Sequence, residues 1–554
     1  ELRLSCQIAD RKYIEQVIFL NNVSKPRLMN KIKSSFVLKI LLLAALAISG
    51  CNSSDVETSS PSPPNLNSLQ QTAYLKASNI GSGDNFGAGG TLLGDAVALS
   101  QDGQILAVGA PFESSDSTGI NGDQTNNSMY GSGAVYIFSL QNGNWTQESY
   151  IKASNPGLAD NFGFITELNG NGDTLAVSSH FEASNATGIN SNQADDSIPQ
   201  AGAVYVFVRT NQGWVQQAYI KASNTGEIGQ GEAFGDGDQF GSAVSLSNDG
   251  NTLAISSITE DGGSAGTNGD QFDNSERSAG AVYLFNRNGE IWEQTAYIKP
   301  SNTGAGDLFG YSLSLTADGR RLAVGSFDED GSISGTNDQQ NDDAPGTGAV
   351  YIFDHNGVTW QQTEYLKASN SEGQDSLGVS VAISDDGNTL VATALDEDGM
   401  TTGINSIAQP DRDSDASTGA VYVYVYDNDS WSEQAYIKSS NTDRNDWFGS
   451  RLALSGDGNT LAASAQLEDS SAKGVDGNQL NNEATEAGAV YLFNRTQDTW
   501  TQTSYIKSSN SEAFDEFGSS MSLNQDGSLL AIGAQFEDSA AEGLDSIQAD
   551  NSAF

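Results

Sequence analysis

The chain has few cysteines, histidines and prolines for its length. Its 554 residues include two cysteines, two histidines and ten prolines. Two cysteines exclude a disulfide-rich scaffold, and His180 and His355 are too few and too far apart to form a histidine-rich metal motif. The sequence also lacks a Gly-Lys-Ser/Thr phosphate loop. Metal, thiol and nucleotide chemistry therefore have little support, and we expect a protein that is not an enzyme.

Basic residues are scarce as well, above all after Cys51. From that position onward the sequence has 17 lysines and arginines against 68 aspartates and glutamates, which gives a formal charge of −51. A surface of this charge repels phosphate backbones, so we expect no binding to nucleic acids. Two interpretations of the acidic surface stay open. It keeps an exported protein soluble, or it attracts cations and basic partners.

Long apolar runs are almost absent, and the longest lies near the start of the chain. Ile40–Ile48 is nine residues long, which is too short for a mature membrane-spanning helix. It follows Met29 and three lysines and precedes Ser49-Gly50-Cys51, the order found in secretory signals. Residues 48–51 also resemble the lipobox of bacterial lipoproteins, which implies cleavage before Cys51 and acylation of its thiol. The alternative is an ordinary signal peptide with an incidental cysteine.

These features divide the N-terminal region into three parts. We expect residues 1–28 to lie upstream of the true start, residues 29–50 to form a lipoprotein signal peptide, and residues 51–70 to form a Ser/Pro/Asn-rich tether. Asn52 after the cysteine resembles the outer-membrane sorting signal of Gram-negative lipoproteins. The expectation is thus an exported protein at the outer membrane or cell surface, attached to the membrane by its lipid anchor only.

The remainder of the chain is a tandem repeat. Tyr-Ile/Leu-Lys, followed one residue later by Ser-Asn, recurs at intervals of 68 to 78 residues, and its tyrosines are Tyr74, Tyr150, Tyr219, Tyr297, Tyr365, Tyr436 and Tyr505. A period of this size indicates supersecondary units that are each too small to bury a hydrophobic face alone.

The third unit shows the expected strands most clearly. Its residues 240–247 alternate as in a strand, Asn248–Asn251 is a hairpin turn with a glycine, and residues 253–255 form a second strand. After a long polar stretch, 259–279, a third strand is expected at 280–285 and a fourth at 292–299. Four antiparallel strands of this kind form one blade of a β-propeller, and radial repetition of the blades forms the propeller.

We therefore predict an all-β fold, a seven-bladed β-propeller of four-stranded antiparallel blades over residues 71–554. An N-terminal outer strand at 71–79 is expected to close the ring, which removes exposed sheet edges. The last blade is expected to be truncated, because the third-strand sequence Gly-Ala-Val-Tyr occurs six times and the seventh unit has no copy. The expected blades are about 80–155, 156–224, 225–302, 303–370, 371–441, 442–510 and a partial blade at 511–554.

A Phe-Gly pair opens nearly every unit. Phe86-Gly87 is followed by Val108-Gly-Ala-Pro111, and the pair recurs at Phe162, Phe240, Phe309, Phe448 and Phe517, with Leu377 in the fifth unit. This pattern resembles the FG-GAP repeat of integrin-α-like propellers. The resemblance implies an exported propeller involved in adhesion or ligand binding. The Asp-Gly turns between first and second strands are shorter than the calcium loops of that family, so we expect the aspartates there to form turns.

Acidic residues recur at two positions near the same rim. An aspartate precedes each Phe-Gly position: Asp84, Asp160, Asp238, Asp307, Asp375, Asp446 and Asp515. The long loops add Asp123, Asp270 and Asp338. Carboxylate and amide oxygens are the ligands that calcium prefers, so these aspartates are candidate calcium ligands, and calcium is the one cofactor we consider. The alternative is that they cap turns through side-chain hydrogen bonds.

A glutamate and a lysine also recur in every unit. The glutamates follow the second strands: Glu113, Glu182, Glu260, Glu329, Glu397, Glu468 and Glu537. The lysines belong to the repeated signature: Lys76, Lys152, Lys221, Lys299, Lys367, Lys438 and Lys507. We expect them to form structural pairs at the rim, exposed and worth at most about 1 kcal/mol each. Binding of a ligand by the lysines is the alternative. Glu167 and Arg451 stand out in the first strands, and we assign them no role.

These observations favour a binding or adhesion module that presents acidic loops on one face to a protein or glycan partner. A periplasmic or outer-membrane assembly scaffold is the alternative, followed by an enzyme acting on polysaccharide. An enzyme would show its polar residues in one or two blades, whereas the acidic positions recur in all seven units.

Overall fold

The computed structural model describes residues 69–79, 81, 83–88, 94–226, 237–331, 344–405, 416–539 and 543–544. The chain divides into two compact units, Glu1–Leu69 and Gln70–Phe554. Cys51, the expected signal peptide and nearly all of the expected tether lie outside the described residues. Within the described residues, no helix combines the length and hydropathy that crossing a membrane requires.

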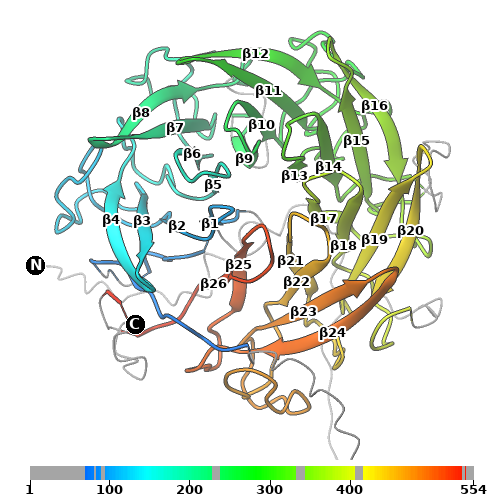
Figure 1. Ribbon diagram of the computed structural model, residues 1–554. Coiled ribbons are helices and arrows are strands. Elements are labelled where there is room, and N and C mark those ends of the chain that lie inside the picture. Colours follow the sequence, from blue (N-terminus) through cyan, green and yellow to red (C-terminus); the bar gives the residue numbers. More distant parts are fainter. Residues whose placement is uncertain are drawn as a thin grey trace, which may run out of the picture. The chain divides into compact units, whose positions relative to one another are not determined.

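Unit Gln70–Phe554 consists of antiparallel sheets arranged in a ring, with the first strand of each sheet innermost (Figure 1). The first sheet contains β1 (Val97–Leu99), β2 (Ile105–Ala110), β3 (Ala134–Gln141) and β4 (Asn144–Ile151). The second contains β5 (Thr166–Leu168), β6 (Thr174–Ser179), β7 (Ala203–Thr210) and β8 (Gly213–Ile220). The third contains β9 (Phe240–Leu246), β10 (Thr252–Ser257), β11 (Ala281–Asn288) and β12 (Ile291–Ile298).

The other sheets repeat this order. The fourth contains β13 (Ser312–Leu315), β14 (Arg321–Ser326), β15 (Ala349–His355) and β16 (Trp360–Leu366). The fifth contains β17 (Leu377–Ile383), β18 (Thr389–Ala394), β19 (Ala420–Asp427) and β20 (Ser430–Ile437). The sixth contains β21 (Phe448–Leu454), β22 (Thr460–Ala465), β23 (Ala489–Thr496) and β24 (Thr499–Ile506). The seventh contains β25 (Phe517–Leu523) and β26 (Leu530–Ala534).

The prediction of seven blades, the last one truncated, is wrong in its blade count, because the described residues form six four-stranded blades and, in the place of the seventh, a sheet of two strands. In each complete sheet the third strand begins within a Gly-Ala-Val-Tyr sequence. The last copy of this sequence begins at Gly488 and leads into β23. The N-terminal segment does not extend the seventh sheet into a ladder. Leu75 forms an isolated antiparallel bridge with Leu544, and Lys76 N–H donates to Gly543 O at 3.0 Å.

The Phe-Gly and Gly-Ala-Val-Tyr sequences determine how sheets pack. Phe309 contacts Tyr351 edge-on with ring centroids 5.4 Å apart, inside a core shared by the third and fourth sheets. Gly280, at the start of the third strand of the preceding unit, has φ +78°, and a Cβ there would overlap the carbonyl oxygen of Phe309. Only glycine combines this backbone conformation with such a close approach. The repeated glycine therefore brings neighbouring sheets together.

A closed cycle of seven backbone hydrogen bonds, here called the axial collar, joins the turns between first and second strands. Each N–H donates to the carbonyl of the next turn at 2.9 to 3.3 Å, in the order Gln101, Gly170, Asn248, Ala317, Asp385, Gly456, Gln525 and back to Gln101. The Asp385 carboxylate also accepts Nε2 of Gln101 at 3.3 Å and of Gln525 at 2.9 Å. All seven units thus close the ring, and polar side chains meet at this end of its axis.

The opposite end of the ring is here called the loop face. First strands begin there, second strands end there, and the long loops to the third strands lie there. In every unit the first strand begins at this face and the second and fourth strands end there, so the recurring aspartates, glutamates and lysines all lie at this face.

Candidate functional site

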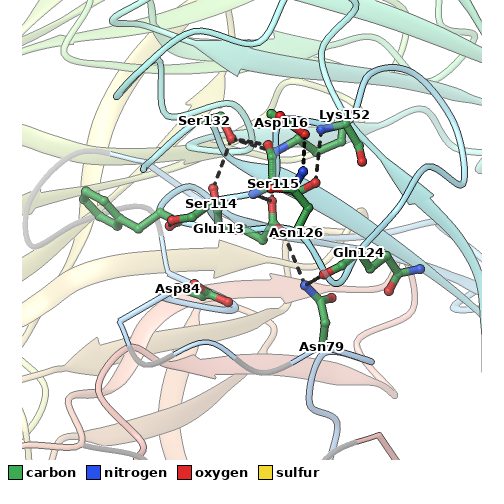
Figure 2. Close-up of polar contacts among 12 residues, drawn as sticks. Asn79, Asp84, Glu113, Ser114, Ser115, Asp116, Gln124, Asn126, Ser132 and Lys152 are labelled. Carbon is green, nitrogen blue, oxygen red and sulfur yellow. Dashed lines mark hydrogen bonds and ion pairs between the residues drawn. The ribbon is translucent and has the colours of Figure 1, made fainter. Parts of the chain in front are cut away.

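Each repeated glutamate is the centre of a buried polar cluster. In the first unit, Glu113 accepts Nζ of Lys152 at 2.8 Å, Nδ2 of Asn79 at 3.3 Å and the N–H of Ser115 at 3.1 Å (Figure 2). Lys152 also donates to Oγ of Ser132 at 2.8 Å. Both charged side chains are 0% exposed. A buried ion pair is retained only where further hydrogen bonds satisfy its remaining polar atoms, as they do here.

The structure joins each signature lysine to the glutamate of its own unit, and the expectation that these pairs are exposed is wrong. Five further pairs, with Nζ–Oε2 distances of 2.6 to 2.9 Å and side chains at most 5% exposed, are Lys221–Glu182, Lys299–Glu260, Lys367–Glu329, Lys438–Glu397 and Lys507–Glu468. The residue just before the third strand also binds the lysine in three of the seven clusters, where Nζ of Lys152, Lys367 and Lys438 donates to the hydroxyl of Ser132, Thr347 and Thr418.

The last copy joins the two ends of the ring. Lys76 Nζ lies 2.8 Å from Oε2 of Glu537, and the hydroxyl of Tyr74 donates to the same carboxylate at 2.6 Å. The Lys76 side chain is 13% exposed and the Glu537 side chain is 7% exposed. This cluster is therefore the most exposed of the seven.

The serine and asparagine of the signature bind the next unit, a role that the sequence prediction missed. Asn224 Nδ2 donates to Glu260 at 3.1 Å and to the carbonyl of Gln271 at 2.9 Å, while its Oδ1 accepts the hydroxyl of Tyr283 at 2.7 Å. The adjacent Ser223 donates to the Gln271 side chain. The recurrence of Ser-Asn one residue after the lysine was the available signal. The signature is thus an inter-sheet clasp.

Burial dominates the electrostatics of these clusters. It lowers the pKa of Lys299, and the Glu260 carboxylate opposes that shift. It also raises the pKa of the Tyr297 hydroxyl, with Glu260 adding to the effect. A lysine held this way at 0% exposure has no free surface to offer to a partner. The clusters stabilise the loop bases, and binding must be sought elsewhere.

The aspartates that precede the Phe-Gly positions cap turns. Asp84 accepts the N–H of Gly81 at 2.8 Å, and Asp307 that of Gly304 at 2.9 Å, in each case three residues earlier. The same bond is made by Asp375, Asp446 and Asp515. Burial raises the pKa of Asp84 to about 6, of Asp160, Asp375 and Asp515 to about 7, and of Asp446 to about 8. Asp238 is also buried, at 7% exposed.

The loop aspartates have similar local partners. Asp123 accepts the N–H of Thr125 at 2.9 Å, and Asp270 that of Phe272 at 3.0 Å, while Asp338 lies outside the described residues. In the described ranges, no three His, Cys, Asp or Glu side chains come together in an arrangement that could hold a metal ion. Calcium stays a prediction, and the described carboxylates are occupied by backbone N–H groups of their own turns.

Side chains that depart from the repeat meet along the ring axis. Arg451 in β21 of the sixth sheet donates from Nη2 to Gly94 O at 3.1 Å, just before β1, and so reaches past the seventh sheet. Asp95 accepts the N–H of Met521 at 3.1 Å. Burial raises the pKa of Asp95 to about 6, against the effect of Arg451. Burial, with a smaller contribution from Asp95, raises the pKa of Glu167 in β5 to about 8.

The sequence prediction noted Glu167 and Arg451 but missed Asp95. Glu167 stands where the third and fourth units have Ser245 and Ser314. Asp95 belongs to a longer segment, since 14 positions separate Phe86 from Ser100 where seven separate Phe162 from Asn169. That difference in length was the signal that could have revealed it.

Aromatic residues surround the loop-face end of the axis. Tyr311, Ile258, Val379 and Leu395 form a buried cluster, against which partly buried Phe327 and Trp447 pack. Tyr311 and Phe327 meet edge-on with ring centroids 4.4 Å apart. Burial raises the pKa of Tyr311 despite the opposing charge of Arg451. Four different sheets contribute to this cluster, which we call the axial aromatic cluster.

A buried histidine, His180, directly follows β6 of the second sheet, at the loop-face end of that strand. The His180 ring stacks between Phe164 and Phe181, with both centroid distances 3.8 Å. His180 is 2% exposed, and its Nδ1 has no hydrogen-bond partner in the described part of the chain. Burial lowers its pKa to about 3, so the ring is neutral. The end of the axis therefore combines aromatic surface with deeper charged groups.

Comparison with known proteins gives one family match and several structural likenesses. The FG-GAP repeat model matches residues 292–353. No curated protein matches the sequence. The periplasmic gluconolactonase PpgL of Pseudomonas aeruginosa is 13% identical, with a TM-score of 0.41 over 79% of this chain and 88% of that one.

Two further structures are similar at the same level. Hydrazine synthase of Kuenenia stuttgartiensis is 12% identical, with a TM-score of 0.42 over 86% of this chain and 98% of that one. The WD40 repeats of RRP9 are 8% identical, with a TM-score of 0.43 over 84% of this chain and 92% of that one. At these identities the functions of the neighbours do not transfer to this chain.

The family match covers one unit boundary, from β12 to β15, and the Phe-Gly position recurs in register in all seven units of the ring. Together these observations show a β-propeller of which residues 292–353 match the FG-GAP repeat.

Proposed function

We propose that this protein is an exported binding module that recognises a glycan or protein partner at the loop face. The observation that carries the proposal is a set of non-repeated side chains along the ring axis, from Glu167 near the collar end of β5, through Asp95 and Arg451, to Tyr311 and Trp447 at the loop face. In a repeat array, positions that depart from the repeat and meet in one place are the expected location of function. Partly exposed aromatic rings beside charged groups suit a sugar ring, which presents apolar faces and hydroxyl groups.

The two ends of the ring axis differ, and the difference favours the loop face as the surface that binds the partner. At the collar, seven turns are hydrogen-bonded to one another, and the side chains of Gln101, Asp385 and Gln525 bond across the axis. Their polar groups already have partners. At the loop face, Trp447 and Phe327 keep exposed surface, and contact with a partner would remove it from water.

The test uses variants that restore the repeat. Trp447 has φ +57°, and its counterparts Asn85 and Asn161 have φ +53° and +57°, so Trp447→Asn fits the backbone. Glu167→Ser takes the residue of the third and fourth units. Binding would be screened on a glycan array and by pull-down from a surface-protein extract, then measured by calorimetry. We expect each variant to weaken binding at least tenfold.

The control is Phe272→Ala, which removes an aromatic ring that is 80% exposed on a long loop. We expect it to bind as the unaltered protein does. The axial variants are Trp447→Asn and Glu167→Ser. If they still bind the partner and Phe272→Ala does not, the partner binds to the long loops and not to the side chains on the ring axis.

A polysaccharide-acting enzyme is the second candidate, and one observation favours it. With pKa values of about 8 and about 6, Glu167 is protonated and Asp95 ionised at neutral pH. Two carboxyl groups held in opposite protonation states serve as acid and base in glycoside hydrolysis. Release of reducing ends from polysaccharides, abolished by Glu167→Gln, would support an enzyme. No release across a broad panel by the unaltered protein would contradict it.

A further inference from the structure

One position at the loop face divides the sheets of the ring into two groups. It is the position that directly follows the second strand of each sheet. In the third, fourth and fifth sheets this position has the apolar residues Ile258, Phe327 and Leu395, after β10, β14 and β18. All three belong to the axial aromatic cluster or pack against it, and residues from four sheets meet in that cluster. The position therefore faces the ring axis, and we call these three side chains the apolar arc.

The same position is polar in most of the remaining sheets. The sixth, seventh and second sheets have Gln466, Gln535 and His180 there, after β22, β26 and β6. The first sheet lies between the seventh and the second, and its residue is Pro111. The three polar side chains are buried, at most 6% exposed. Because their sheets follow one another around the ring, these three side chains form one side of the axis, here called the polar arc, opposite the apolar arc.

Two side chains of the polar arc have a buried atom without a hydrogen-bond partner in the described part of the ring. These atoms are Oε1 of Gln535 and Nδ1 of His180. The His180 ring contacts Phe164, which follows the Phe-Gly pair of its unit as Tyr311 follows that of the fourth unit, so it lies beside the axis. Buried polar atoms in folded proteins are nearly always hydrogen-bonded. A ligand that reaches the axis would supply the partners that these two atoms lack.

The two arcs favour a neutral ligand that is apolar on one side and hydroxylated on the other. The polar arc consists of two carboxamides and an imidazole, and burial lowers the pKa of His180 to about 3, so all three side chains are uncharged at neutral pH. Arg451, a cation on the same axis, already donates to the carbonyl oxygens of Gly94 and Ser450. A sugar hydroxyl both donates and accepts hydrogen bonds, as a carboxamide does. The ring of a pyranose presents C–H groups on its face and hydroxyl groups at its edge.

The collar end of the axis limits how a glycan can enter. There the turns of all seven units are hydrogen-bonded to one another, and the Asp385 carboxylate accepts the side chains of Gln101 and Gln525. A polysaccharide therefore cannot thread through the ring, and only the end of a glycan can reach the two arcs from the loop face. Building on the proposed function, we propose that the arcs bind the terminal neutral pyranose of a glycan, with its C–H face on the apolar arc and its hydroxyl groups on the polar arc.

The test uses the 554-residue chain and the methyl pyranosides of glucose, galactose and mannose, each beside the pyranoside of the corresponding uronic acid. The methyl group takes the place of the rest of the glycan. Binding is followed by calorimetry and by tryptophan fluorescence, because partly buried Trp447 packs against the axial aromatic cluster. We expect saturable 1:1 binding of at least one neutral pyranoside, and at least tenfold weaker binding of its uronic acid.

Gln535→Leu tests the polar arc. Leucine has a similar volume and lacks the amide, so we expect at least tenfold weaker binding of the pyranoside. The melting midpoint should not fall, because the variant removes a buried carbonyl oxygen that has no partner among the described residues. A glutamine with only a structural role would instead lower the midpoint and leave the affinity unchanged. Gln212→Leu, in the exposed turn between β7 and β8, is the matched control and should change neither quantity.

Three outcomes would overturn the proposal. The first is no saturable binding of any neutral pyranoside at about 100 mM, where a millimolar complex is saturated. The second is unchanged affinity of Gln535→Leu, and the third is a uronic acid that binds as tightly as its neutral counterpart. A protein partner that is lost in Trp447→Asn and with which no pyranoside competes would refute the sugar site and leave binding at the loop face intact. A pyranoside bound equally by Trp447→Asn and Gln535→Leu would contradict both.

Discussion

Lys299→Met tests whether the repeated ion pairs stabilise the ring. Lys299 and Glu260 are both 0% exposed, and their Nζ–Oε2 distance is 2.9 Å. Methionine keeps nearly the same volume and removes the charge, so no cavity is created. Glu260 would remain buried with three donors, the hydroxyl of Tyr297, Nδ2 of Asn224 and the N–H of Gly262.

The expected magnitude follows from this environment. Removing one partner of a buried ion pair costs about 3 to 5 kcal/mol, because the other charge stays buried without its counterion. The three remaining donors stabilise the carboxylate, so we expect the lower end, about 3 kcal/mol. Lys299→Met combined with Glu260→Gln removes both charges, and it should recover at least half of this loss.

Urea unfolding followed by tryptophan fluorescence measures the change. Lys76→Met is the matched control, because Lys76 and Glu537 form the same pair at 13% and 7% exposure, and the greater contact with water lowers the cost to about 2 kcal/mol, between the values for exposed and buried pairs. A loss below about 1 kcal/mol for Lys299→Met, or a loss no greater than that of Lys76→Met, would refute the reasoning.

Four further predictions concern pH, the collar, calcium and the anchor. The pKa of Asp446 rises from 3.8 to about 8 on folding, so this group makes the folded state less stable as the pH rises between these values. In thermal melts, the stability of Asp446→Asn relative to the unaltered protein should therefore increase from about pH 4 to about pH 8. A difference in stability that stays constant with pH would contradict this. Gly170→Ala should lower the melting midpoint because its Cβ would displace the Asn248 side chain beside the collar, whereas Gly373→Ala, whose nearest neighbour is 3.6 Å away, should not; equal effects would show that this packing beside the collar does not stabilise the ring. If calcium binds, a chelator should lower the melting midpoint of calcium-saturated protein, and an unchanged midpoint would exclude a stabilising site. Cys51→Ala should abolish processing and membrane association in cells, and unchanged fractionation would rule out the lipid anchor.

The strand order was predictable because the repeat supplied independent copies of one pattern. Alternation in residues 240–247, the Asn-Asp-Gly turn and Gly-Ala-Val-Tyr placed β9, β10 and β11 within a few residues of their observed bounds. The blade count of seven came from the signature tyrosines, with the last blade expected to be truncated. Four-stranded sheets depend on third strands, and the described chain has six of them, as many as its copies of Gly-Ala-Val-Tyr.

Burial was the property that the sequence prediction misjudged. Lysine and glutamate at strand ends were expected at the surface, as is usual for charged residues. Lys152 and Glu113 are instead completely buried, because the long loop that follows Glu113 folds back over them. That loop has polar composition, and nothing in its composition distinguishes a covering loop from a solvated one. The axial site was hidden for another reason, since Asp95, Glu167 and Arg451 are separated in sequence and meet only when the ring closes.

The Lys76–Glu537 cluster has a mechanical consequence. It joins two segments 461 residues apart in the sequence, and among the described residues the N-terminal one, 69–79, forms a single isolated bridge instead of a ladder. Tension applied to the chain from its N-terminal side would load the bonds of Tyr74, Leu75 and Lys76 one after another, as in peeling, while the clasps between complete sheets share the load. The ring would thus open at this seam under force before any four-stranded sheet lost a strand.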